Sequence, residues 1–186
     1  MHPFMRYAAI LLILLNVHCG LQRALRVSTD DASQIIIGSQ SSPLERYAAR
    51  ELQRYLYQVS GTLLEIRQDV TDIRTPAFVI GQVTTNPLVH DLVHAGELTV
   101  AADDPGPQGY VLKKISVNGR PLIAIAGSDV VGCLYGVYGL LADYYGIGFF
   151  LGGDVLPDKK STLQWLNLDE RKAPAMYIRG FLPWTN

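Results

Sequence analysis

Residues 34–61 read QIIIGSQSSPLERYAARELQRYLYQVSG and contain one strand signal followed at once by one helix signal. The run 34–38 is apolar and rich in β-branched isoleucine, which is typical of a strand buried on both faces of a sheet. Ser42 precedes Pro43 at the first helical position, and Glu45 stands three residues after Ser42, the spacing of a capping box. The stretch therefore predicts a central strand that leads into a helix.

The helix that begins at Pro43 is predicted to be amphipathic and to end at Gly61. Its apolar side chains recur at steps of three and four residues, the spacing of one helical face that packs on a sheet. They are Leu44, Tyr47, Ala48, Leu52, Tyr55, Leu56 and Val59. The polar side chains are expected on the other side of the helix, and they are Glu45, Arg46, Arg50, Gln53 and Arg54.

The chain beyond this helix continues to alternate strand and helix signals. Short apolar runs at 63–67 and 77–81 predict two more strands. Runs at 109–117 and 121–126 flank Asn118-Gly119, and Asn-Gly between two strand-like runs predicts a β-hairpin because both residues tolerate positive φ. The pattern as a whole indicates an α/β domain.

A second helix is predicted after a Ser128 or Asp129 cap. Its apolar face carries Val130, Leu134, Val137, Tyr138, Leu141 and Tyr145. Three glycines lie on a neighbouring face, namely Gly132, Gly136 and Gly139. Because glycine lowers helix propensity, we expect another part of the chain to approach that face closely.

The composition indicates a globular chain that does not bind nucleic acid. Of the 186 residues 48% are hydrophobic and 18% charged, and the formal net charge is −1. No stretch gathers Lys and Arg into a surface that would neutralise phosphates, so nucleic acid is not an expected partner. The two cysteines, Cys19 and Cys133, are too few for a disulfide framework.

The first twenty residues are typical of a secretory signal peptide. Arg6 is followed by an apolar run at 7–15 and a more polar stretch at 16–20. The apolar run is shorter than the roughly 20 residues that cross a bilayer, so no transmembrane span is expected. An uncleaved anchor, the alternative, needs a longer apolar stretch.

Cleavage near Cys19 would leave a protein that is secreted, or periplasmic and associated with the cell envelope. A lipoprotein signal wants a small residue directly before the cysteine, whereas His18 stands there. We therefore favour release over lipid anchoring at Cys19.

His90 and His94 are four residues apart, as in the helix of a zinc protease. In that motif a glutamate base directly follows the first histidine. Here Asp91 follows His90, and its side chain is one methylene shorter than that of glutamate. A third ligand would have to come from Glu97, Asp103 or Asp104. The favoured interpretation is two solvated histidines on a short surface helix, and a zinc hydrolase is the alternative.

Other chemical motifs also have structural interpretations. The glycines at 146–153 follow a helix and precede an apolar run, which is the reverse of a dinucleotide fingerprint, so Gly146 is interpreted as a helix C-cap and the rest as a turn into a strand. Cys133 is interpreted as a small buried apolar residue. The pairs Asp30–Asp31 and Asp103–Asp104 are interpreted as solvated loop charges. No catalytic residue, metal ligand or cofactor site is therefore assigned.

Several motifs follow one another in a distinctive order. PLERYAAREL at 43–52 is followed by FVIG at 78–81, Gly109-Tyr110, AGSD at 126–129 and, after the second helix, GIGFF at 146–150. This order resembles the N-terminal domain of α-glucuronidases of glycoside hydrolase family 67. It is also similar to the accessory domain that precedes the barrel in family 20 β-hexosaminidases.

The resemblance implies an α/β (α+β-like) fold with a mixed β-sheet and two main helices packed mostly on one face. It also implies a domain without catalytic residues that leads into a (β/α)8 barrel. The chain then divides into a signal peptide at 1–20, an α-glucuronidase-type accessory domain at 30–168, and a linker with the first strand of a missing barrel at 169–186.

The segment 174–186, PAMYIRGFLPWTN, resembles that linker and first barrel strand. Residues at the C-terminal ends of barrel strands line the substrate pocket. Within a complete barrel, Trp184 is a candidate to stack on a sugar ring and Asn186 to hydrogen-bond its hydroxyls. The alternative is an aromatic and a polar residue that only close a strand.

Glycoside hydrolysis needs a pair of carboxylates, which in this family lie on later barrel strands. We expect that this chain alone does not hydrolyse glycosides, and that it contacts carbohydrate through a missing or separate barrel. It is interpreted as the non-catalytic N-terminal domain of a secreted glycoside hydrolase that acts in polysaccharide breakdown. A truncated copy and a free-standing carbohydrate-binding or interaction module are the alternatives.

Overall fold

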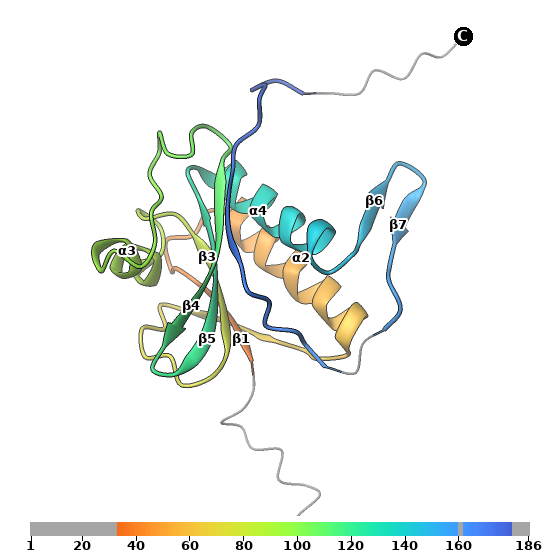
Figure 1. Ribbon diagram of the computed structural model, residues 1–186, viewed down its shortest axis with the longest axis horizontal. Coiled ribbons are helices and arrows are strands. Elements are labelled where there is room, and N and C mark those ends of the chain that lie inside the picture. The colour runs from red at the N-terminus through yellow and green to blue at the C-terminus, as the bar shows by residue number, and fades with distance from the viewer. Residues whose placement is uncertain (1–32, 160–161, 180–186) are drawn as a thin grey trace, which may run out of the picture. The chain divides into compact units, whose positions relative to one another are not determined.

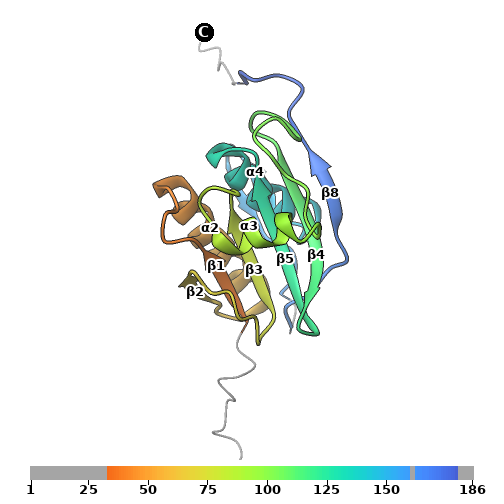
Figure 2. The ribbon, with the colours of Figure 1, turned by 90° about the vertical axis from the view of Figure 1, so that its left-hand side faces the viewer.

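The computed structural model describes residues 33–159 and 162–179, which contain a six-stranded mixed sheet (Figures 1 and 2). In spatial order the strands are β2 (Glu65–Gln68), β1 (Gln34–Ile37), β3 (Ala77–Gly81), β5 (Arg120–Gly127), β4 (Tyr110–Val117) and β8 (Asp169–Lys172). The first four run parallel, whereas β4 is antiparallel to β5 and β8 is antiparallel to β4. The α/β fold with a mixed sheet is confirmed.

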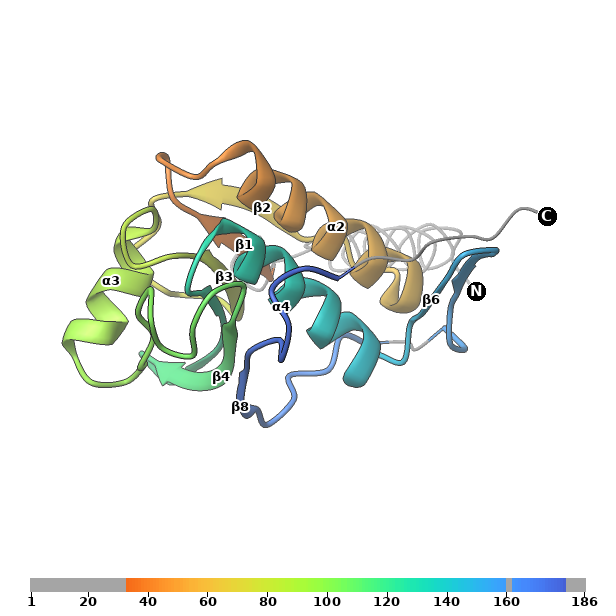
Figure 3. The ribbon, with the colours of Figure 1, turned by 90° about the horizontal axis from the view of Figure 1, so that it is seen from above.

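Helices cover both faces of this sheet (Figures 1 and 3). The two long helices, α2 (Pro43–Ser60) and α4 (Val130–Asp143), pack against each other on one face. The shorter α3 (Pro87–His94) packs on the other face, against β3. Because side chains alternate along a strand, Ile35 joins the core under the long helices and Ile36 joins the core under α3. The two main helices therefore share one face, as predicted.

None of the helices in the described residues has the length and apolar character that crossing a bilayer requires.

The predicted local signals form as expected. Ser42 Oγ accepts from the Glu45 N–H at 3.2 Å, and a Glu45 carboxylate oxygen accepts from the Ser42 N–H at 2.6 Å, which completes the capping box of α2. Gly61 ends this helix with φ 75°. Asn118 and Gly119 join β4 to β5 with φ of 51° and 73°, the positive values that a tight two-residue hairpin turn requires.

The glycines of α4 lie where the start of β4 crosses the helix. A Cβ on Gly132 would come within 2.1 Å of the Gly109 carbonyl oxygen, and a Cβ on Gly139 within 2.3 Å of the Tyr110 hydroxyl. The predicted close approach is thus confirmed, and its partner is the segment that enters β4.

Some boundaries differ from the prediction. β2 begins at Glu65, two residues later than expected, and most of it is exposed, since it is the edge strand of the sheet. Helix α4 ends at Asp143 with Tyr144 as its C-cap, so Gly146 is not the cap, although its φ is 74°. The glycine-rich residues that follow form a hairpin of β6 (Gly148–Phe150) and β7 (Gly153–Val155).

The last part of the domain is a strap, defined here as residues 162–172, that ends in β8. The Trp165 ring lies 4.8 Å from the Phe78 ring between centroids, and Leu168 is buried in the same core. The expected linker begins at residue 169, and its first four residues, Asp169–Lys172, pair with β4. Their run DERK has no apolar alternation because an edge strand faces solvent, and this explains why the pattern did not reveal it.

Candidate functional site

Glu45 lies where the carboxyl ends of β1 and β3 meet, and it is fully buried. Its carboxylate accepts from Thr85 Oγ1 at 2.5 Å and from Gln82 Nε2 at 3.3 Å, in addition to the backbone of Ser42. The sequence placed Glu45 on the polar side of α2, and this was wrong because loop groups after β3 satisfy the carboxylate inside the protein. Its role is therefore structural.

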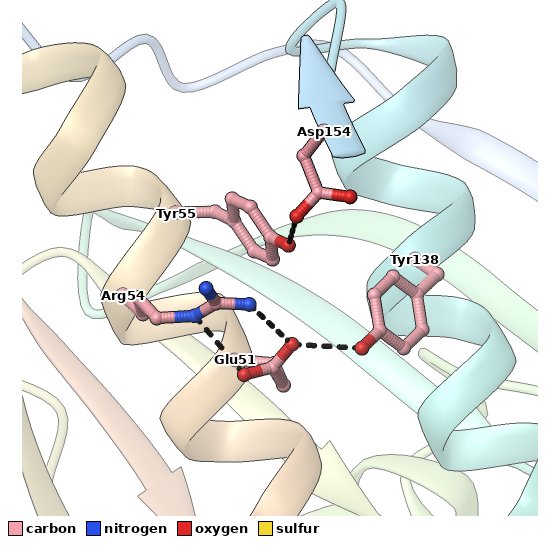
Figure 4. Close-up of polar contacts among 5 residues, drawn as sticks. All are labelled: Glu51, Arg54, Tyr55, Tyr138 and Asp154. Atoms are coloured by element: carbon pink, nitrogen blue, oxygen red, sulfur yellow. Dashed lines mark hydrogen bonds and ion pairs between the residues drawn. The ribbon is translucent and has the colours of Figure 1, made fainter. Parts of the chain in front are cut away.

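A second carboxylate, Glu51, joins the two long helices (Figure 4). It accepts from Arg54 Nη2 at 2.8 Å and Nε at 3.1 Å on the same helix, and from the Tyr138 hydroxyl of α4 at 2.7 Å. Burial, followed by this hydrogen bond, raises the pKa of Tyr138. Glu51 was not singled out from the sequence, because its position next to Leu52 gave no sign that a tyrosine from α4 would reach it.

The β6–β7 hairpin is fastened to the same helix pair. The Tyr55 hydroxyl donates to Asp154 of the hairpin (Figure 4). The Phe149 ring meets Tyr55 and Tyr138 edge-to-face, with centroid distances of 5.3 Å and 4.9 Å. Aromatic pairs favour this geometry over a face-to-face sandwich. The base of the hairpin is thus held by one aromatic cluster and one charged hydrogen bond.

The outer part of the hairpin is apolar and exposed. Phe150 is 65% exposed, Leu151 93% and Val155 59%. Phe149, Phe150, Leu151 and Asp154 line a shallow cavity of about 370 Å³. Exposed apolar groups gathered in one place mark interaction sites. We call this hairpin, residues 148–155, the candidate docking surface.

Replacement of Tyr55 by phenylalanine is expected to loosen the hairpin and to lower the free energy of unfolding by about 1.5 kcal/mol, since a hydrogen bond to a charged group is lost. Hydrogen exchange of the amides at 148–155 measures the loosening, and urea unfolding measures the stability. Tyr57→Phe is the control, because Tyr57 is exposed on the same helix. Equal effects of the two changes would contradict the role of the Tyr55 hydroxyl in holding the hairpin.

Alkaline pH is expected to destabilise the same junction. Burial, followed by the hydrogen bond to Asp154, raises the pKa of Tyr55 from 10.0 to about 12. Because the folded-state pKa lies above the unfolded one, this phenol contributes stability that is complete below pH 10 and is lost as the pH rises through about 12. Circular dichroism and tyrosinate absorbance, followed together, should change in that window. Titration of Tyr55 near pH 10 in the folded protein would contradict this.

The histidine pair lies on α3. The His90 and His94 rings are 4.3 Å apart between centroids, and His90 Nδ1 lies 3.2 Å from the Asp91 carboxylate. Among residues 33–159 and 162–179, no group of three or more His, Cys, Asp or Glu could hold a metal ion. The short helix expected for the pair is confirmed, and both side chains lie at the surface.

The other singled-out residues occupy structural positions or lie outside the described part of the chain. Cys133 is buried, and burial raises the pKa of its thiol. Asp104 pairs with Arg171 of β8. Asp30 with Asp31, Trp184 and Asn186 lie outside the described residues.

The segment that follows β8 contacts the start of β4 and the outer side of α4. Arg179 donates to Gln108 Oε1 at 2.9 Å and lies over the Tyr135 ring at 4.9 Å from its centroid. Gln108 Nε2 in turn donates to the Tyr177 carbonyl at 3.1 Å. The side chains of residues 176–178 are exposed and apolar, so this segment is a second apolar surface.

Comparisons with known proteins relate this domain to glycoside hydrolases. The family model described as glycosyl hydrolase family 67 N-terminus matches residues 20–140. Among solved structures, a family GH115 4-O-methyl-α-glucuronidase with specificity for decorated arabinogalactans matches with a TM-score of 0.50 and 19% identity. That match covers 78% of this chain but only 18% of that chain, and the likeness is one of fold. No curated protein matches the chain.

Proposed function

We propose a function from one premise, which is that this chain belongs to the family of glycosyl hydrolase family 67 N-terminal domains. The chain is the accessory domain of a secreted, α-glucuronidase-like glycoside hydrolase that acts in polysaccharide breakdown. The resemblance predicted from the sequence is thereby confirmed at the level of the family. The activity, the secretion and the non-catalytic role are the proposal.

The non-catalytic role is supported by the two buried carboxylates. Glycosidases need a proton-donating carboxyl group and a second carboxylate on either side of the scissile bond. Glu45 and Glu51 instead accept hydrogen bonds from neighbouring elements and are almost inaccessible to solvent. Neither is placed to approach a sugar, so neither serves as a catalytic carboxylate, and we assign hydrolysis to the carboxylates of the barrel.

The main support for a role in docking to another domain is the position of the exposed apolar side chains. Of the ten large exposed hydrophobic residues in the described chain, seven lie between Phe150 and Ile178. They belong to the candidate docking surface, to residues just after it, and to the segment 176–178. We assign the catalytic (β/α)8 barrel of the same polypeptide as the partner that covers them.

A pair of assays tests this function. The mature chain alone, incubated with 4-O-methylglucuronoxylan oligosaccharides, is expected to release no uronic acid. In the longer gene product, Phe150→Asp combined with Leu151→Asp is expected to lower the thermal midpoint of the barrel and its hydrolytic rate, while the mature chain alone keeps its own stability. Leu63→Asp is the control, since Leu63 is exposed but remote in sequence from the docking surface. The same loss in Leu63→Asp, or no loss in the double variant, would refute docking.

A free-standing carbohydrate-binding module is the second candidate function. It is favoured by the shallow cavity beside Phe150, because aromatic side chains are common platforms for ligands in such cavities. Affinity electrophoresis in gels that contain glucuronoxylan or arabinogalactan separates the two functions. Retardation of the mature chain that disappears in Phe150→Ala would favour the module, and unchanged migration would favour the accessory domain.

A further inference from the structure

Strand β3 is flanked by two crevices at the carboxyl end of the sheet. It pairs in parallel with β1 on one side and with β5 on the other. The helices that follow β1 and β5 lie on one face, and the helix that follows β3 lies on the opposite face. In open α/β sheets, ligands bind outside the carboxyl ends of strands at the points where the connections diverge in this way.

The crevice between β1 and β3 is filled by the protein itself. Glu45 and Thr85 meet in it, and Asn86 Nδ2 donates to the Ile80 carbonyl at 2.9 Å. A Cβ on Gly38 would lie 1.8 Å from the Thr85 carbonyl oxygen, so the two loops are in direct contact. These contacts close the crevice between the two loops.

The crevice between β3 and β5 contains a cavity of about 110 Å³, lined by residues 82–84, 101–102 and 127–128. Ser128 is 8% exposed, and its hydroxyl oxygen is buried without a hydrogen-bond partner among the described residues. The backbone N–H of Ser128 is already bonded to the Gly109 carbonyl at 2.9 Å. Buried polar groups are rarely left unpaired, because the loss of their hydration is then not compensated by a hydrogen bond. A ligand oxygen in the cavity would supply the missing partner.

The surroundings select for a neutral ligand. None of the lining residues carries a charge. The amino end of α4 does not offer its amides to an anion, because Asp129 caps it: its carboxylate accepts from the Gly132 N–H at 2.7 Å and from the Gln108 N–H at 2.8 Å. The negative charge of Asp129 also repels anions.

The size of the cavity selects for a small group. One water needs about 10–15 Å³ of such space, whereas pockets that enclose a whole drug-sized ligand measure about 300–1,000 Å³. We infer that the β3–β5 crevice is a binding site for a primary alcohol group, carried by a small polyol or by the hydroxymethyl arm of a sugar, that hydrogen-bonds to Ser128 Oγ. This inference does not depend on the proposed docking role.

A titration of the ¹⁵N-labelled mature chain tests the site. Glycerol and methyl β-D-glucopyranoside, which carry a primary alcohol group, are expected to give saturable shifts of the amides at 82–84, 101–102 and 127–128. Methyl β-D-xylopyranoside, which lacks the hydroxymethyl arm, and sodium sulfate are expected to give none. Saturation by glycerol alone identifies a free polyol as the ligand. Saturation by both compounds shows that the site also accepts the hydroxymethyl arm of a sugar.

Ser128→Ala is expected to weaken binding at least tenfold and to leave the thermal midpoint unchanged or raised, since an unpaired hydroxyl is removed. Ser116→Ala is the matched control, because Ser116 is exposed on β4, and it should bind as the unchanged chain does. The inference is overturned if neither alcohol saturates, if the xyloside or sulfate gives the same shifts, or if Ser128→Ala binds equally well.

Discussion

Replacement of Gly132 by alanine is expected to lower the free energy of unfolding by about 3 kcal/mol, as overpacking does when the neighbours cannot yield. The new Cβ would stand 2.1 Å from the carbonyl oxygen of Gly109, which belongs to the backbone and cannot rotate away. Alanine improves helix propensity by up to about 1 kcal/mol, so the clash exceeds the gain. Urea unfolding followed by circular dichroism measures the difference.

Gly139→Ala is the matched control for this change, since Gly139 lies in the same helix and alanine there gives the same gain in helix propensity. Its Cβ would meet the Tyr110 hydroxyl at 2.3 Å, which is the end of a side chain and not a backbone atom. The loss should therefore be smaller than for Gly132→Ala. If Gly132→Ala proved as stable as the unchanged chain, the close packing of β4 on α4 would be disproved.

Replacement of Glu45 by alanine is expected to cost about 3 kcal/mol, because each buried group left without a partner costs about 1–3 kcal/mol. The change orphans the Ser42 N–H and the Thr85 hydroxyl and opens the crevice between β1 and β3. Thermal and urea unfolding measure the loss. Glu65→Ala serves as control and should stay within about 0.5 kcal/mol, since Glu65 is exposed on the edge strand. A similarly small effect at Glu45 would show that its carboxylate is not needed to close the crevice.

The local structure could be predicted from the sequence because its signals are themselves local. The capping box at Ser42 and the Asn118-Gly119 turn each depend on residues that are at most three positions apart. The glycines of α4 were informative for another reason. A helix that accepts three residues of low propensity must gain something from their missing side chains, and here it gains contact with the start of β4.

The long-range contacts could not be predicted in the same way. Glu45 looked solvent-facing because its partner Thr85 lies forty residues further along the chain. The strand β8 is made only of charged residues, and it pairs with β4 directly after Trp165 and Leu168, which pack in the core. Asp154 likewise gave no signal, since Tyr55, its partner, lies on α2. Pairs that meet only after folding leave no periodic pattern in one sequence.

The central claim is that this domain serves a catalytic barrel in the same polypeptide, and sequencing the transcript through and beyond the Asn186 codon tests it most directly. We predict that the reading frame continues into alternating strand and helix segments with carboxylates near the ends of later strands, as a (β/α)8 glycosidase barrel requires. A stop codon directly after Asn186, confirmed in independent transcripts, would contradict the claim and leave a separate binding module as the function of this chain.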